Sequence, residues 1–340
     1  MSAPLRTVLI GFGRIAAAEA GNRTKARFYR FASHVQVLAA HPGFELVGAA
    51  DPDPAARECA ARDWNVPAVA ESAAGLARLA PEVAVLAVPP GARLAALAAL
   101  PGLRGVLVEK PLALAGPERR AFAQACRARD LVVQVNYFRR ADATYRDLAA
   151  GGLAARIGAA QAAFGLYGRG LFNIGAHFVD LARLLLGEVA WARALGSESR
   201  GETAYPGDPN LPFALGLACG ATASFMPVDY ARYREGGLDI WGEAGRVSLL
   251  VEGLLGLAFP TGTHRALDDR REIASDRPEI LPFTLGEAYY GMYDDLLAAL
   301  AGEQACCCGL DQALATEAVC DAVLASAAAG GALVRPDKGK

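Results

Sequence analysis

The sequence lacks the features that mark nucleic-acid-binding, membrane-inserted or secreted proteins. Its 34 basic and 36 acidic residues leave a formal net charge of -2, so there is no basic field to attract nucleic acid or an anionic membrane. No apolar run reaches the roughly 18–20 residues of a membrane-spanning helix. The opening MSAPLRT also lacks the apolar core of a signal peptide. We therefore expect a cytoplasmic globular protein with no nucleic-acid or membrane partner.

Cysteine is present, but it lacks the paired spacing of a disulfide framework. The seven cysteines are an odd number, and three of them are adjacent in a stretch with no histidine nearby. Adjacent thiols rarely reach one metal ion, so we expect reduced thiols and no metal site. The cysteines are Cys59, Cys126, Cys219, Cys306, Cys307, Cys308 and Cys320.

The length of 340 residues and the 53% hydrophobic content are enough for two separate cores. β-rich runs alternate with helical stretches as far as residue 135, which predicts a doubly wound, mostly parallel α/β sheet. The rhythm then changes, so we predict one domain over residues 1–135 and another over 136–340. The strands expected in the first domain are 6–10, 44–50, 67–69, 82–88, 106–108 and 131–135, and the helices are 54–62, 72–79, 92–100 and 117–129.

A dinucleotide-binding fingerprint directly follows the first predicted strand. Gly11 permits a tight turn, Gly13 lets the backbone approach a pyrophosphate, and Ala16 keeps the following helix close to the strand. The first amides of that alanine-rich helix would receive the negative charge. The residues expected to bind the dinucleotide here are Gly11, Phe12, Gly13, Arg14 and Ile15.

The second predicted strand ends at Asp51. A carboxylate there accepts the ribose hydroxyls of NAD and repels the 2′-phosphate of NADP, so NAD is expected rather than NADP. Asp51 lies about 40 residues after Gly11, where roughly 20 are usual. The excess, residues 19–33, is rich in arginine and aromatic side chains. It is either an extra helical turn or surface loop, or a flap near the cofactor or an anionic substrate.

Two further strand ends carry groups of functional interest, because open α/β sheets bind ligands at the carboxyl ends of their strands. Val88, Pro89 and Pro90 follow one strand, and their backbone is expected to line the cofactor groove. Glu109 and Lys110 follow another, and they too are expected to contact the cofactor. Desolvation can lower the pKa of a lysine there and make it a proton carrier, whereas the plainer reading is a lysine paired with Glu109.

The second half contains a polar row on a predicted helix. Asn173, His177 and Asp180 are spaced i, i+4, i+7 and so share one helix face. On this face, His177 either presents a proton donor to a cleft or has a structural role. The opposite, core-facing stripe comprises Phe178, Leu181, Leu184 and Leu185. Upstream we expect a helix over 137–149, broken at Gly151-Gly152, and a strand over 156–166.

These pieces together resemble the glucose–fructose oxidoreductase / inositol dehydrogenase / MocA (Gfo/Idh/MocA) family over nearly the whole chain. The motifs are GFGRIA, Asp51, VEKP and NIGAHFVDLARLLLG, with EAYYGMYDDLLAAL and ALATEAVCDAVLASA similar to the closing helices. The resemblance implies an N-terminal Rossmann domain and a C-terminal α/β domain with an open, mostly antiparallel sheet. That sheet would use segments 156–166, 191–196, 213–219, 221–226, 238–242 and 246–251, and would form homodimers or homotetramers.

The resemblance further implies NAD(P)-dependent hydride transfer between the nicotinamide and a secondary alcohol or ketone of a sugar, cyclitol or nucleotide sugar. By position, Lys110 and His177 handle the hydroxyl proton. Asn173 stands where relatives commonly carry Asp, and an amide can orient a hydroxyl but cannot take its proton. Arg93 stands where many relatives have His, and a helix-surface arginine is one reading of it. Tyr167, Arg169 and Asp180 are candidate substrate contacts, and the basic insert could meet an anionic group or be a solvated face.

Two alternatives stay open on the same scaffold. One is a glycoside-cleaving enzyme that uses tightly held NAD with no net redox change. The other is a non-catalytic regulator that binds NAD and a sugar. Retention of Lys110 and His177 weighs against the regulator, whereas Asn173 leaves room for it.

Overall fold

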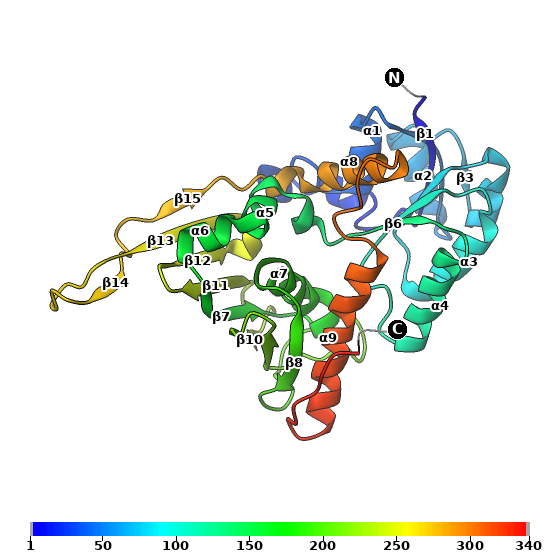
Figure 1. The fold of residues 1–340 in the computed structure, drawn as a ribbon. Helices are drawn as coiled ribbons and strands as arrows, with labels where there is room; N and C mark the ends of the chain where they lie inside the picture. Colours follow the sequence, from blue (N-terminus) through cyan, green and yellow to red (C-terminus); the bar gives the residue numbers. More distant parts are fainter. Residues whose placement is uncertain (1–2, 338–340) are drawn as a thin grey trace. The chain divides into compact units, whose positions relative to one another are not determined.

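The computed structural model describes residues 3–337, and the chain divides into two compact units. The first joins Met1–Ala141 to Leu285–Ala313, and the second joins Asp142–Thr284 to Leu314–Lys340. In Figure 1 the first unit is therefore blue to teal with an orange return segment. The first crossing lies a few residues after the predicted boundary, and the return segment, which we had assigned to the second domain, belongs to the first unit.

The first unit contains the predicted parallel sheet, with six strands in the order β3-β2-β1-β4-β5-β6 over its described residues. Strand order reverses between β1 and β4, which is the point where open α/β sheets bind ligands. β4 and β5 are buried along their whole length, as expected for central parallel strands. The strands are β1 Leu5–Ile10, β2 Phe44–Ala50, β3 Val69–Ala70, β4 Val83–Leu86, β5 Gly105–Val108 and β6 Val132–Val135.

Helices and 3₁₀ turns connect these strands close to the predicted positions. Asp53 caps the first turn of α2 by accepting the Ala55 amide. The helices are α1 His34–Ala40, α2 Pro54–Asp63, α3 Pro90–Ala99 and α4 Gly116–Arg127, with 3₁₀ segments η3 Ala73–Leu79 and η4 Phe138–Ala141.

The α-helix predicted directly after the glycine-rich turn is wrong. Residues 14–17 form a hydrogen-bonded turn, and two 3₁₀ segments follow, η1 Ala18–Gly21 and η2 Lys25–Arg27. The physical reason is local sequence: Gly21-Asn22 favours a turn, and the polar stretch after it has no apolar helical period. The first α-helix of the chain, α1, begins only at His34.

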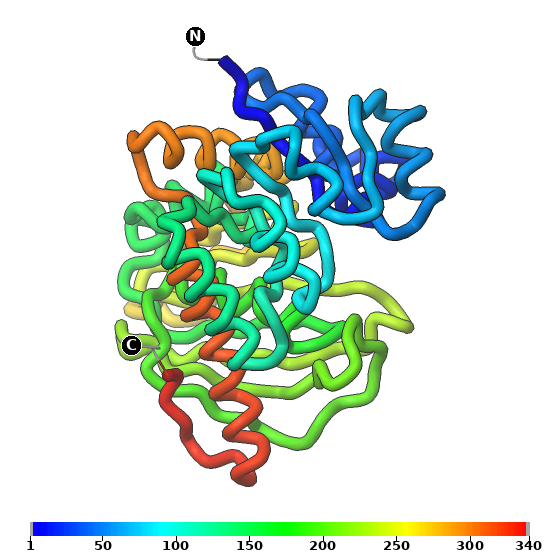
Figure 2. The backbone as a smooth tube through the Cα atoms, turned by 90° about the vertical axis from the view of Figure 1, so that its right-hand side faces the viewer, coloured from blue at the N-terminus to red at the C-terminus, as the bar shows by residue number. Residues whose placement is uncertain are grey.

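The return segment completes the core of the first unit. It contains η8 Leu285–Glu287 and α8 Ala288–Leu300. Tyr289, Met292, Tyr293 and Leu296 of α8 are buried in the same hydrophobic cluster as Leu9 of β1. Figure 2 shows this late segment in orange, far along the colour scale from the blue and cyan strands whose core it completes.

The second unit contains the predicted open, mostly antiparallel sheet. Its described strands have the order β14-β13-β12-β11-β7-β10-β9-β8, and β15 pairs with β13. β7 and β10 form the single parallel pair among these strands. The strands are β7 Ala160–Tyr167, β8 Val189–Ala194, β9 Phe213–Leu217, β10 Thr222–Pro227, β11 Gly237–Gly242, β12 Gly245–Leu250, β13 Leu255–Thr263, β14 Arg271–Ile273 and β15 Glu279–Leu281.

Two predictions upstream of this sheet need correction. The helix expected over 137–149 is instead η4, α5 Ala143–Asp147 and the π-helical η5 Leu148–Gly152. Gly151, with φ +116°, kinks the chain without ending it, because α6 Leu153–Ile157 continues directly. Arg156 therefore lies in a helix, and the strand expected from residue 156 begins only at Ala160.

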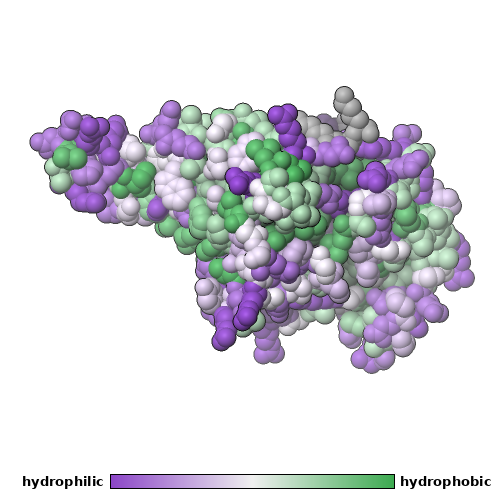
Figure 3. All heavy atoms as spheres, turned by 90° about the horizontal axis from the view of Figure 1, so that it is seen from below, coloured by the Kyte–Doolittle hydropathy of each residue, from purple (hydrophilic) through white to green (hydrophobic). Residues whose placement is uncertain are grey.

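Three remaining elements of the second unit carry or flank its polar groups. η6 Leu171–Gly175 leads into α7 Ala176–Leu186, and η7 Val251–Gly253 joins β12 to β13. α9 Leu310–Ala328 begins in the range of the first unit and lies in the second from Leu314 onward. The end of β13 and β14 form a hairpin whose surface is mostly hydrophilic in Figure 3. No helix within residues 3–337 combines the length and apolar content required to cross a membrane.

Candidate functional site

The glycine-rich turn has the geometry of a dinucleotide site. Gly11 adopts φ +87°, and a Cβ there would lie 2.5 Å from the Ala87 carbonyl oxygen at the end of β4, so only glycine fits. Gly13 has open space where its Cβ would project, so a ligand can approach its backbone. The Phe12 amide donates to Asp51 Oδ2 at 2.7 Å, and the Asp53 amide donates to Asp51 Oδ1 at 2.9 Å. The Asp51 carboxylate is thus held beside the turn with lone pairs left for a ribose.

A cavity of about 690 Å³ opens beside this turn, between the turns after β1 and the helix α2. Phe12, Gly13 and Arg14 line one side, and Asp53 lies on the other. The remaining lining residues are Ala17, Ala18, Ala20, Gly21, Gln36, Ala56, Cys59, Asp63 and Trp64. Together with the open face of Gly13, the cavity shows that the first turn has room for a ligand.

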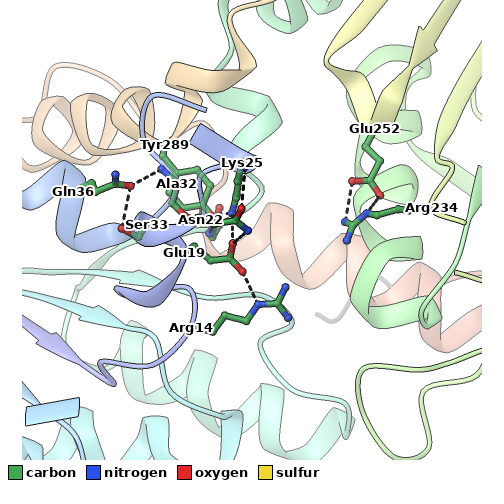
Figure 4. Close-up of polar contacts among 11 residues, drawn as sticks. Arg14, Glu19, Asn22, Lys25, Ala32, Ser33, Gln36, Arg234, Glu252 and Tyr289 are labelled. Atoms are coloured by element: carbon green, nitrogen blue, oxygen red, sulfur yellow. Dashed lines mark hydrogen bonds and ion pairs between the residues drawn. The ribbon is translucent and has the colours of Figure 1, made fainter. Parts of the chain in front are cut away.

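The insert 19–33 is folded, and the charged side chains at its start form ion pairs (Figure 4). The buried Glu19 carboxylate accepts from Arg14 Nε at 2.6 Å and lies 3.6 Å from Lys25 Nζ. Burial alone would raise the pKa of Glu19, but the Arg14 hydrogen bond and the Lys25 charge hold it below its ordinary value. At the far end, Gln36 Oε1 accepts from the Ala32 amide and the Ser33 hydroxyl. The segment is thus held at both ends by hydrogen bonds. Its role as a flap stays a prediction.

The segment after β4 contains Val88, Pro89 and Pro90. Arg93 connects this segment to the one that follows β5. Arg93 is buried, not on the helix surface. Its guanidinium donates to the Val88 carbonyl at 3.2 Å and to the carbonyls of Pro111 and Leu112 at 2.6 and 2.8 Å. One side chain thus joins the residues after β4 to the loop that follows Lys110.

Glu109 points into a buried polar network within the first unit. Its Oε1 lies 2.8 Å from His34 Nε2 and 2.5 Å from Asn136 Nδ2. His34 Nδ1 lies 2.9 Å from the Tyr293 hydroxyl, and Asn136 Nδ2 also donates to the Tyr289 hydroxyl at 3.0 Å. His34 and Asn136 thus both bond the Glu109 carboxylate, and a contact of Glu109 to the cofactor stays a prediction.

The electrostatics of this network favour an ionised Glu109 and neutral tyrosines. Burial by itself would raise the pKa of Glu109, but hydrogen bonding and charge from His34, with smaller effects of Asn136 and Lys110, hold it below its ordinary value. Burial, with the Glu109 charge next, raises the pKa of Tyr293 far above its usual range. Tyr293 keeps its proton, and its hydroxyl lies beside His34 Nδ1, while the Glu109 carboxylate accepts from His34 Nε2.

In the second unit, a buried aspartate shapes the turn before α7. Asp208 accepts the backbone amides of Phe172 at 2.7 Å and Asn173 at 3.0 Å. The Asn173 side-chain amide donates to the Arg169 carbonyl at 3.1 Å, so Asn173 joins two ends of the turn. Arg169 itself adopts φ +63° and pairs with Glu202 at 3.3 Å.

The other predicted substrate contacts lie deep in the second unit. The Tyr167 hydroxyl is buried, donates to the Leu211 carbonyl at 2.6 Å and accepts its amide at 3.0 Å. Asp180 accepts the Thr316 hydroxyl at 3.0 Å. Both side chains are therefore buried and hydrogen-bonded within the unit, and their role as substrate contacts stays a prediction.

The prediction of a two-faced helix around His177 is wrong. His177 and Asp180 are buried, as are Phe178 and Leu181, whereas Leu184 and Leu185 of the expected core stripe are only partly buried. The helix is surrounded because residues of α9 meet its polar side, where Thr316 bonds both Asp180 and Arg183. His177 is 8% exposed and lies in the first turn of α7.

Sequence reasoning missed His34, Asn136 and Asp208, and for Arg93 it offered a helix-surface position as one reading. None of them lies in a motif, and each acts on residues far away in the chain. His34 is one of only four histidines, which was the one available signal for it. No group of three or more His, Cys, Asp or Glu side chains within residues 3–337 is arranged to hold a metal ion.

Comparisons with known proteins bear on the whole chain. Residues 5–137 match the model "Oxidoreductase family, NAD-binding Rossmann fold" of Gfo/Idh/MocA, and residues 167–334 match that of its "C-terminal alpha/beta domain". No curated protein matches the sequence.

Solved structures share the fold at low identity. An NAD-binding oxidoreductase from Klebsiella pneumoniae is 18% identical, with 99% and 100% of the two chains covered and a TM-score of 0.76. The WlbA dehydrogenase from Bordetella pertussis, in complex with NADH and UDP-GlcNAcA, is 20% identical, with 98% of each chain covered and a TM-score of 0.72. A levoglucosan dehydrogenase with NADH and levoglucosan is 20% identical, with 99% and 100% covered and a TM-score of 0.75.

Proposed function

Because the chain belongs to the Gfo/Idh/MocA oxidoreductase family, whose first domain is an NAD-binding Rossmann fold, we propose that it transfers hydride between NAD and a secondary alcohol or ketone. The observation that carries this proposal is the position of Lys110, two residues after the end of the buried strand β5 in the sheet of the first unit. The substrate class we propose is a sugar, cyclitol or nucleotide sugar. The levoglucosan and UDP-GlcNAcA complexes of similar folds support this choice.

The chain's own residues would hold the cofactor as follows. The backbone at Gly11, Phe12 and Gly13 receives the pyrophosphate, and the Asp51 carboxylate accepts ribose hydroxyls and repels a 2′-phosphate. The open face of Gly13 and the fixed position of Asp51 both fit this assignment. Bound NAD supplies the hydride acceptor at its nicotinamide ring.

Lys110 is the principal acid–base group in this proposal. As a free amine it removes the proton from the substrate hydroxyl during oxidation, and as an ammonium it returns that proton during reduction. His177 assists as a second group that binds or exchanges the hydroxyl proton. The Asn173 amide does not act as an acid or a base, and its Nδ2 donates to the Arg169 carbonyl, so in this proposal Asn173 serves to orient.

The decisive experiment measures turnover and NAD binding together. Purified protein is incubated with NAD and a panel of sugars, cyclitols, uronates and nucleotide sugars while NADH absorbance is followed. Lys110→Met should abolish NADH formation and leave the NAD dissociation constant nearly unchanged. Lys25→Met is the matched control, because Lys25 pairs with Glu19 in the insert.

Three outcomes would redirect the proposal. Near-wild-type turnover of Lys110→Met would remove Lys110 from the mechanism. Cleavage of a glycoside without accumulated NADH would favour the redox-neutral alternative, and NAD binding with no chemistry on any substrate would favour a regulator.

We also propose that the protein assembles into a homodimer or homotetramer through the open sheet of the second unit. β7 alternates buried and exposed residues, and its Phe164 is 39% exposed, as expected of a sheet with one face still available. Native mass spectrometry of the wild type and of Phe164→Glu tests this. A shift of the variant towards monomer is expected, and a monomeric wild type would contradict the assembly.

A further inference from the structure

The residues that follow Lys110 form a segment that is largely buried and lies in neither a helix nor a strand. Pro111, Leu112 and Ala113 are buried, and the next helix, α4, begins only at Gly116. Buried backbone carbonyls outside regular structure need donors from elsewhere, because a buried polar group without a hydrogen bond costs free energy. In this segment, two buried arginines supply donors.

The two arginines come from the helices on either side of β5 in the chain. Arg93 of α3 donates through Nη1 to the carbonyls of Pro111 at 2.6 Å and Leu112 at 2.8 Å. Arg119 of α4 donates through Nη1 to the next carbonyl, that of Ala113, at 2.8 Å. Both arginines are buried. Three successive carbonyls after Lys110 are therefore bonded by guanidinium groups.

A second nitrogen of Arg93 binds the segment that follows β4. Its Nε donates to the Val88 carbonyl at 3.2 Å, while its Nη1 binds the carbonyls of Pro111 and Leu112. Because a guanidinium is planar and rigid, these two nitrogens fix the separation between the segments after β4 and β5. A lysine at this position carries one nitrogen, so it can bind one segment but not both.

Val88 in turn lies against the glycine-rich turn. A Cβ added to Gly11 would lie 2.9 Å from Val88 Cγ1, so the Val88 side chain packs directly on the Gly11 backbone. The carbonyl of the same residue accepts from Arg93. Since Arg93 also binds Pro111, a continuous series of contacts leads from the proposed pyrophosphate site to the residue after Lys110. All of these residues belong to the first unit.

We propose that Arg93 is a positioning residue, which fixes the backbone that carries Lys110 relative to the bound dinucleotide. Hydride leaves the substrate carbon and the proton leaves the oxygen bonded to it, so the nicotinamide and the Lys110 amine must keep a set separation. Arg93 acts through backbone carbonyls and exchanges no proton, because a guanidinium stays protonated. The inference rests on the role of Lys110 in the proposed function.

The chain allows a direct measurement, because it contains only four lysines, at positions 25, 110, 338 and 340. Protein labelled with ¹³C-lysine gives four Cε signals, and the one absent from Lys110→Met is that of Lys110. Saturation with NAD, without substrate, should shift this signal in the wild type. Arg93→Met should lose most of that shift, while its NAD dissociation constant stays within about threefold because the dinucleotide-binding turn is intact.

Two further variants separate positioning from general stability. Arg93→Lys keeps the buried charge but lacks the second nitrogen, so it should also lose most of the NAD-induced shift. Arg119→Met is the matched control, because Arg119 is also buried, carries the same charge and binds a carbonyl of the same segment. It should lower the stability of the fold but keep most of the NAD-induced shift of the Lys110 signal.

With a substrate in hand, kcat and KM should respond differently. A misplacement of about 1 Å can cost about 100-fold in rate, so Arg93→Met and Arg93→Lys should lower kcat by about 10- to 100-fold. The KM for NAD should change by less than about threefold, since the dinucleotide-binding turn is unaltered.

Three results would overturn the proposal. They are a full NAD-induced shift of the Lys110 signal in folded Arg93→Met or Arg93→Lys, equal losses of the shift in Arg93→Met and Arg119→Met, and a wild-type signal that does not respond to bound NAD. If Arg93→Met does not fold, Arg93→Lys alone decides. Failure of the proposed function shows separately, as undiminished turnover of Lys110→Met, and leaves the NMR result interpretable.

Discussion

The carboxylate of Asp51 accepts the backbone amide of Phe12 at 2.7 Å, across the gap between the ends of β1 and β2. One side chain therefore both fixes the glycine-rich turn and presents a negative charge at the expected ribose position.

Asp51→Ala should weaken NAD binding by about 10- to 100-fold, since hydrogen bonds to a charged group contribute about 1.5–3 kcal/mol. Isothermal titration with NAD measures this. Glu82→Ala is the control: the Glu82 carboxylate also accepts a backbone amide, that of Arg6, but beside the amino end of β4, so its loss should leave the NAD dissociation constant within about twofold. Unchanged NAD affinity in Asp51→Ala would contradict the ribose assignment.

Asp208→Ala should destabilise the second unit, because the amides of Phe172 and Asn173 would lose their acceptor in a buried site. The expected cost is about 1–3 kcal/mol for each unsatisfied amide, read from urea unfolding. Asp229→Ala is the comparison, since Asp229 also accepts a backbone amide but in a more exposed loop. Equal losses in the two variants would argue against a special role of Asp208.

Glu109 should contribute to the acid dependence of stability. Its pKa in the folded protein is lowered from an ordinary value of 4.5, against the effect of burial, chiefly by His34. The ionised carboxylate therefore stabilises the fold above pH 4.5, and this contribution is lost as the pH falls from there through the lowered pKa. Between pH 7 and pH 3, the Tm of Glu109→Gln should fall less steeply than the Tm of the wild type. Parallel curves of Tm against pH would refute this.

Cysteine reactivity should follow burial. Burial raises the pKa of Cys306 to about 12 and that of Cys126 to about 11, so both stay protonated near neutral pH. Cys219 is exposed. Brief alkylation of the folded protein at pH 8, read by peptide mass spectrometry, should modify Cys219 first. Early modification of Cys306 would show that its loop opens.

Much of the first unit could be predicted from the sequence, because its signals are local. Apolar runs such as Val106–Val108 and punctuation by glycine and proline mark the parallel strands within a residue or two. The same reasoning fails after Ile15, where the expected helix is replaced by 3₁₀ turns. An alanine-rich start predicts an α-helix, but the stretch before Gly21-Asn22 forms only a hydrogen-bonded turn and a 3₁₀ segment.

The candidate site was only partly predictable for a different reason. Lys110 and His177 lie in recognisable motifs, whereas the partners of their neighbours do not. His34 reaches Glu109 across 75 residues, and Asp208 reaches Asn173 across 35. Pairings of this kind depend on tertiary structure, which neither spacing nor periodicity reveals. The prediction of an exposed polar face on α7 is wrong for the same reason. α9, which is distant in sequence, packs against that face.

The return of residues 285–313 to the first unit limits how this protein can be dissected. A fragment that stops at Ala141 would lack Met292 and Tyr293, which are fully buried in the cluster shared with Leu9 and Val35. It would also lack the hydroxyl that bonds His34. A gene fragment cut at the apparent end of the nucleotide-binding half should therefore yield an insoluble or unfolded product, and a minimal stand-alone version requires α8 to be spliced onto its carboxyl end.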